Sequence, residues 1–117
     1  MLLVKEKGLL IYIIKHCQRI EETVKETTKE EFLENNLFKD SICFNLLQIG
    51  ELAKKFDPNF IKEYGNAPWK KIKGMRDVIV HGYGTVVFNK IWDTATNDIV
   101  PLHEYCLKII ESNPEVE

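Results

Sequence analysis

Hydrophobic side chains recur at steps of three and four residues through most of the chain, which is the spacing of one helix face. The first stripe predicts a helix from Val4 to Glu26 with a charged opposite face, and it consists of Leu10, Ile13, Cys17, Ile20 and Val24. Thr28 and Glu31 then form a capping-box pattern, in which the threonine hydroxyl accepts from a first-turn N–H while the glutamate reaches back. Asn35-Asn36 predicts a local break shortly afterwards.

The second half of the chain shows three further segments. An apolar stripe over 42–56 predicts a long helix that ends at Asp57-Pro58, because the residue before a proline is pushed out of the α region. A loop containing Gly65 and Asn66 should follow. Pro68 suits the first turn of a third helix, whose apolar side is Trp69, Ile72, Met75 and Ile79 and whose end lies between Gly82 and Gly84. A last helix is predicted over 88–111, with a kink at Pro101.

No alternating strand pattern longer than a few residues is present, so the predicted fold class is all-α. The segments should pack as an antiparallel bundle of four main helices, three long and one shorter, with the last helix kinked. The 117 residues are one domain's worth of chain. We expect a single helical domain over 1–112 and a C-terminal tail over 113–117.

Composition narrows the class of protein further. With 44% hydrophobic and 29% charged residues, the chain is neither disordered nor a membrane protein, and a net charge of −2 argues against a generally cationic nucleic-acid binder. The longest apolar run, Leu9 to Ile14, is far shorter than a membrane span and lacks a signal-peptide cleavage site. The three cysteines lie in apolar stripes and are expected to be buried thiols. We therefore expect a cytoplasmic protein with no membrane association.

Several familiar chemical signatures are absent from the sequence, including a phosphate-binding glycine-rich loop, Cys-x-x-Cys and His-Glu-x-x-His. Two histidine–cysteine pairs, His16 with Cys17 and His103 with Cys106, invite a metal-site interpretation. The first pair points to different helix faces, and two ligands do not make a site. No metal and no cofactor are therefore predicted.

The segment from Met75 to Gly84 carries the most distinctive chemistry. Arg76 offers a permanently charged fork suited to phosphate oxygens, and His81 can exchange protons near neutral pH. Both lie where the third helix runs out into a glycine-flanked turn, next to the Tyr83 phenol. A purely structural alternative is that Arg76 pairs with Asp77 or Glu51 while His81 caps the helix C-terminus.

The spacing Arg76-x4-His81-x-Tyr83 resembles the Arg-x4-His-x-Tyr motif of the HEPN superfamily, and more narrowly the HepT-like toxins of toxin–antitoxin pairs. The resemblance covers roughly Leu9 to Ile110. Its other landmarks are Ile49-Gly50-Glu51, Trp69 with Ile72 and Gly74-Met75, and Ile91-Trp92 with Ile99-Val100-Pro101-Leu102.

This resemblance implies a HEPN-like fold, a homodimer and a metal-independent RNA endonuclease with Arg76 and His81 as catalytic residues. Asp77 and Glu51 are then supporting residues. It also implies a neutralising partner, a minimal nucleotidyltransferase that adenylylates the motif tyrosine, which here is Tyr83.

Metal-free cleavage by the ribose 2′-OH needs a base, an acid and positive charge on the phosphorane. One chain offers a single such histidine, and on an ideal helix Arg76 and His81 lie about 140° apart. Two protomers around a two-fold axis would supply two Arg/His sets to one cleft. Near Arg76, the basic residues Lys70, Lys71 and Lys73 form a candidate RNA-binding patch, the alternative being a solvated helix face.

Two other functions stay open at this point. One is a non-catalytic HEPN module, a nucleotide- or partner-binding dimer that engages the nucleotidyltransferase. The other is a helical scaffold subunit. The intact Arg76/His81 pair separates the ribonuclease from the binding module, because binding alone does not need that pair.

Overall fold

The computed structural model describes residues 2–65, 67–82 and 87–114, and within these ranges helices joined by short connections make up the chain, with no strand. The described helices are α1 (Val4–Glu26), α2 (Lys29–Glu34), α3 (Asn36–Ala53), α4 (Pro58–Glu63), α5 (Trp69–Gly82), α6 (Phe88–Asn97) and α7 (Ile99–Glu111). The predicted all-α class is confirmed. None of these helices is long and apolar enough to cross a membrane.

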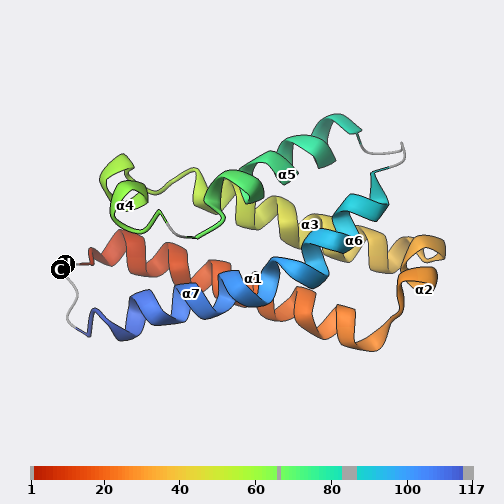
Figure 1. Cartoon of the computed structure of the whole chain (residues 1–117), viewed down its shortest axis with the longest axis horizontal. Helices are drawn as coiled ribbons and strands as arrows, with labels where there is room; N and C mark the ends of the chain where they lie inside the picture. Colours follow the sequence, from red (N-terminus) through yellow and green to blue (C-terminus); the bar gives the residue numbers. More distant parts are fainter. Residues whose placement is uncertain (1, 66, 83–86, 115–117) are drawn as a thin grey trace.

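The long elements lie side by side along the molecule (Figure 1). The most extensive packing is of α1 against α3 and α7, and of α3 against α5. This places α3 between α1 and α5, in the antiparallel bundle expected from the sequence. The short α4 lies beside the first turns of α1 at one end of the bundle (Figure 1).

Two side-chain caps, Thr28 and Asn35, set the ends of the short helix α2 between α1 and α3, at the positions that the sequence predicts. The Thr28 Oγ1 atom accepts from the Glu31 N–H at 3.2 Å. Glu31 reaches back to the Thr28 hydroxyl (3.2 Å), which differs from the backbone N–H of a full capping box. The Asn35 Oδ1 atom accepts from the N–H groups of Leu37 and Phe38, so this one residue ends α2 and begins α3.

The chain between α3 and the loop at Gly65 differs from the prediction, because it contains a short helix. α3 already ends at Ala53, and Pro58 occupies the first turn of an additional helix, α4. Phe60 in that helix stacks on Phe56, with ring centroids 4.2 Å apart, and both rings contact Trp69. Six residues are too short for a helical period to show in the sequence, so burial of these aromatic rings is what orders the segment.

The single last helix predicted over 88–111 is wrong, because the structure has two helices there. α6 ends at Asn97, and α7 begins at Ile99. The expected kink at Pro101 is therefore a break one turn earlier. A proline has no N–H for the carbonyl four residues before it, here Asn97, and its ring clashes with that carbonyl.

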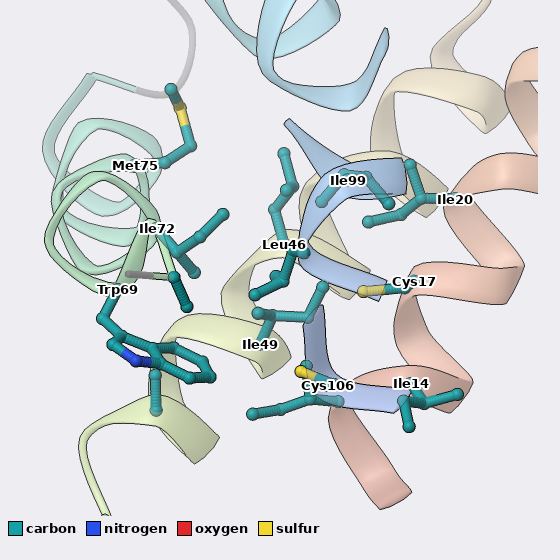
Figure 2. Packing of buried hydrophobic residues seen from close by; sticks show 14 of the residues in the cluster. Ile14, Cys17, Ile20, Leu46, Ile49, Trp69, Ile72, Met75, Ile99 and Cys106 are labelled. Atoms are coloured by element: carbon teal, nitrogen blue, oxygen red, sulfur yellow. The ribbon is translucent and has the colours of Figure 1, made fainter. Parts of the chain in front are cut away.

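One apolar core runs through the bundle. Leu46 and Ile49 of α3 lie between α5 on one side and α1 with α7 on the other (Figure 2). Cys17, Cys43 and Cys106 are free and buried in it, as predicted, and burial raises the pKa of the Cys43 thiol to about 11. The Trp69 indole N–H donates to the Tyr64 carbonyl at 2.8 Å and so joins α5 to the end of α4.

Candidate functional site

Arg76 lies on α5 where that helix crosses α3, and its side chain is 27% exposed. Its Nε–H donates to Glu51 Oε1 of α3 at 2.6 Å, and Nη1 donates to Asp77 Oδ1 at 3.0 Å. Glu51 also faces Lys54, with 3.7 Å between Oε1 and Nζ. The pairing that the sequence offered as a structural alternative is therefore present, and it involves both carboxylates.

Gly50 explains why α3 and α5 can approach so closely at this point. A Cβ atom on Gly50 would lie 2.7 Å from the Arg76 Cβ and 3.5 Å from the Ile72 carbonyl oxygen. Only a residue without a side chain leaves room for the arginine stem here. The Gly50-Glu51 dipeptide thus provides both the space for Arg76 and its carboxylate partner.

Arg76 and its two carboxylate neighbours each stabilise the charged form of the other. Hydrogen bonds from Arg76 to Asp77 and Glu51 raise the arginine pKa above its usual value. The same hydrogen bond from Arg76 is the main reason why the Glu51 pKa is lowered. The guanidinium is therefore a permanent cation fixed in one orientation, which is the property needed to hold a phosphate in a defined position.

His81 lies in the last turn of α5 and is exposed. Because α5 is continuous from Arg76 to His81, the two side chains leave the helix about 140° apart, as expected from ideal geometry. Neither Arg76 nor His81 lines the cavity beside His103 or the cavity beside Glu6. Tyr83, the third motif residue, lies outside the described residues, as does Gly84.

The three candidate RNA-binding lysines do not share one face of α5. Lys70 is exposed and lies eleven residues before His81, so the two point in directions about 20° apart. Lys73 is half-buried and lies one turn before Arg76. Lys71 points to the opposite edge of the apolar stripe, where its Nζ is 2.9 Å from Asp98 Oδ2 at the α6–α7 junction.

The other two histidines are engaged elsewhere in the bundle. His16 lies 2.8 Å from Asn45 Oδ1, and the Asn45 amide donates to the Ser41 carbonyl. His103 Nδ1 lies 2.7 Å from Glu21 Oε1. Within the described ranges, no group of three or more His, Cys, Asp or Glu side chains is arranged to hold a metal ion.

Sequence reasoning missed one charged residue with unusual surroundings. Glu6 in the first turn of α1 is only 3% exposed, and neither of its carboxylate oxygens has a hydrogen-bond partner among the described residues. A signal was available in the sequence, because Glu6 is one helical turn before Leu10 and therefore falls near the apolar stripe.

Comparison with known proteins identifies the same family as the Arg76-x4-His81-x-Tyr83 motif. The sequence profile of the family described as "Ribonuclease HepT-like" matches residues 13–109. A "Putative RNase" of Caldanaerobacter subterraneus subsp. tengcongensis is 30% identical over 102 residues, covering 87% of this chain and 91% of the relative. The "Probable ribonuclease HepT" of Thermococcus cleftensis is 30% identical over 96 residues, covering 82% and 87%.

A longer relative from Methanocaldococcus jannaschii, "Gamma-glutamylcyclotransferase and putative RNase", is 31% identical over 105 residues. That alignment covers 90% of this chain but 47% of the relative. No solved structure matches. The profile covers most of the chain, including the Gly50-Glu51 and Arg76–His81 positions, and the chain belongs to the HepT-like ribonuclease family.

Proposed function

We propose that this protein is a metal-independent RNA endonuclease whose active site is formed by two copies of the chain. The observation that carries the proposal is the guanidinium of Arg76, fixed by Glu51 and Asp77, on the same helix as an exposed histidine. A fixed cation and an imidazole are two of the groups that cleavage of a phosphodiester by its own 2′-OH requires. The HepT-like ribonuclease family membership supports the same reaction class.

The proposed reaction is an internal transesterification. A base removes the 2′-OH proton, the 2′ oxygen forms a bond to phosphorus, and the bond from phosphorus to the 5′ oxygen breaks as an acid protonates that oxygen. The products are a 2′,3′-cyclic phosphate and a 5′-hydroxyl. His81 serves in one of the proton transfers, and Arg76 stabilises the negative charge that develops on the phosphorane oxygens.

Two features of the site indicate that a second protomer takes part in it. A single chain brings one exposed histidine to the site, whereas the reaction has two proton transfers. Exposed apolar side chains also occur on both helices of this crossing: Val80 (48% exposed) lies one turn after Arg76, and Phe44 (53% exposed) lies two turns before Glu51, with its ring beside that of His16. We propose that the second protomer covers both of these side chains.

RNA binding and regulation complete the proposal. Lys70 and Lys73, on the side of α5 between Arg76 and His81, are the basic residues best placed to attract phosphates, and Lys71 is held by Asp98. We further propose that the chain is the toxin of a toxin–antitoxin pair. Its partner, a minimal nucleotidyltransferase, would silence it by attaching AMP to Tyr83.

The decisive experiment is cleavage of a fluorogenic RNA by the purified protein and its His81→Ala variant, with and without EDTA. We expect EDTA to have no effect and His81→Ala to lower the rate by about 100-fold or more, the usual contribution of a general acid or base. His103→Ala is the matched control, because it removes a histidine that pairs with Glu21 elsewhere. Cleavage that survives His81→Ala, or that stops with EDTA and returns with magnesium, would contradict the mechanism.

One observation favours the non-catalytic module as a second candidate. Both carboxylates beside Arg76 already occupy donors of its guanidinium. If the wild-type protein binds RNA or nucleotides at this face but cleaves no RNA under any condition tested, the binding module replaces the nuclease.

A further inference from the structure

The exposed aromatic side chains of the described ranges lie where α1 packs against α3. Tyr12 on α1 is 56% exposed and Phe44 on α3 is 53% exposed, and no other phenylalanine, tyrosine or tryptophan in these ranges is exposed. His16 lies between them: it follows Tyr12 by one turn of α1, and its ring centroid is 6.4 Å from that of Phe44. Three rings from two helices therefore form a row on one face of the bundle.

The charge along this row is positive, although the chain as a whole has a net charge of −2. The stretch 7–20 of α1 contains no acidic residue, and every charged residue in it is a lysine or an arginine. The stretch 41–50 of α3, which packs against α1, contains no charged residue at all. Lys15 and Arg19 follow Tyr12 by three and seven residues, so they lie on the same side of α1 as its ring. This part of the surface therefore attracts anions.

Neither of these two cations is neutralised by the rest of the described chain. Ion pairs engage Lys5, Lys54 and Lys71 elsewhere, whereas no described carboxylate oxygen lies within 4.0 Å of Lys15 or Arg19. The Lys15 ammonium lies 5.2 Å from the centre of the Tyr12 ring, which is a cation–π distance. An exposed ring with a cation beside it is the combination that binds a base together with its phosphate.

Hydrogen bonds hold the middle ring of the row, His16, in one orientation. The buried Asn45 amide nitrogen donates to the Ser41 carbonyl at 2.8 Å, so the oxygen of the same amide faces His16. His16 Nδ1 lies 2.8 Å from that oxygen and therefore donates to it. In the neutral ring, Nε2 is then left to accept a hydrogen bond from an N–H or O–H group of a ligand.

We infer that single-stranded RNA binds to the α1–α3 face, which we define as Tyr12, Lys15, His16 and Arg19. The Tyr12 ring stacks on a base, and the two cations bind neighbouring phosphates. A single strand is required, because the stacked bases of a duplex cover each other's faces. The face adjoins Phe44, which we assign to the second protomer, and so continues the proposed interface. The inference rests on the proposed function for the nature of the ligand, RNA, but it uses none of the residues around Arg76.

The test is the binding of a fluorescein-labelled, single-stranded 2′-O-methyl RNA of about 12 nucleotides, followed by fluorescence anisotropy. The methyl group blocks the 2′ oxygen as a nucleophile, so the wild-type protein binds this RNA without cleaving it. Tyr12→Ala should raise the Kd about tenfold, which is the loss expected for one stacked base. Tyr12→Phe is the matched variant, and it should bind as the wild type does because it keeps the ring. A duplex of the same sequence should bind more weakly than the single strand.

Charge variants test the phosphate contacts. Lys15→Gln and Arg19→Gln should each reduce the slope of log K against log salt by about 0.7, the value for one phosphate of a single strand. Lys25→Gln is the matched control with the same change in net charge. Lys25 is an exposed lysine of the same helix, but it lines the cavity beside His103 of α7, so its variant should show the wild-type slope.

Equal affinity of Tyr12→Ala and the wild type, equal affinity for the duplex, or no RNA binding by the wild type would each overturn the inference. A Tyr12→Ala protein of lower mass than the wild type in light scattering would also overturn it, because Tyr12 would then contact another protein chain. The cleavage assay decides the proposed function separately. RNA that binds through Tyr12 but is never cleaved would contradict the nuclease and leave the inference in place.

Discussion

At the scale of single residues, two glutamates show how surroundings decide what a carboxylate does. Glu51 accepts a hydrogen bond from a guanidinium, and its pKa is lowered, so it stays ionised and fixes Arg76. Glu6 has no such partner, and burial raises its pKa. The first carboxylate fixes the orientation of a guanidinium, whereas the second destabilises the fold when it is ionised.

The Glu6 environment predicts a pH-dependent effect of Glu6→Gln on the free energy of unfolding. Below the ordinary glutamate pKa of 4.5, both folded and unfolded chains carry a protonated Glu6, and the variant should match the wild type. As the pH rises above this value, the unfolded chain ionises first and wild-type stability falls. At neutral pH the variant should therefore be more stable, by about 1 kcal/mol, the cost typical of one unsatisfied buried polar group. Urea unfolding at pH 4 and pH 7 measures this difference, and an equal difference at both pH values would contradict it.

At the scale of helices, the crossing of α3 and α5 depends on one missing side chain. Gly50→Ala would place a Cβ atom 2.7 Å from the Arg76 Cβ, next to a carbonyl oxygen that cannot move independently of its helix. We expect a loss of about 1–3 kcal/mol in the free energy of unfolding, the range for overpacked contacts.

Gly74→Ala is the matched control for this prediction. Gly74 also lies within a helix, but nothing stands within 4 Å of its added Cβ. Its replacement should stabilise α5 by up to about 1 kcal/mol, because alanine is the better helix former. Urea unfolding of both variants gives the comparison, and equal effects of the two substitutions would show that the close approach at Gly50 is not what limits the packing.

The same scale shows what the sequence can and cannot predict. The predicted bounds of α1 agree with the structure, because many periodic positions support them, whereas α3 begins before and ends before its predicted stripe over 42–56. α4 escaped prediction because its order comes from rings that meet only in the fold, Phe56, Phe60 and Trp69. For the site, the motif identified Arg76 and His81 as candidates. The Gly50 approach and the Glu51 contact follow from how α3 and α5 cross, which local spacing does not determine.

At the scale of the whole molecule, the exposed Phe44 and Val80, on the two helices that carry Glu51 and Arg76, and the proposed two-protomer site lead us to predict a homodimer. Phe44→Asp should convert it to a monomer, because a charge placed in the centre of an apolar interface is not compensated there. Leu37→Asp is the control, an 80% exposed residue at the far end of α3. Light scattering at micromolar concentration gives the mass of each variant. A wild-type protein that is monomeric would contradict the two-protomer site.

Tyr83 links the whole molecule to its proposed antitoxin. It follows His81 by two residues, so an AMP group attached to its phenol would carry a phosphodiester charge into the neighbourhood of Arg76. That phosphate would compete with RNA for the guanidinium and repel the incoming strand, which silences the nuclease without unfolding it. Coexpression with a neighbouring minimal nucleotidyltransferase should therefore add the mass of one AMP and abolish RNA cleavage.

Tyr83→Phe should remain unmodified and active in the presence of this partner, because it lacks the acceptor hydroxyl. Tyr12→Phe is the matched control: Tyr12 is 56% exposed on α1, so an enzyme that modified any accessible phenol would act there too. Intact-mass measurement together with the cleavage assay separates the outcomes. An adduct that persists on Tyr83→Phe, or modified wild-type protein that cleaves RNA at the unmodified rate, would show that Tyr83 does not control the site, and Arg76 and His81 would then need another means of restraint.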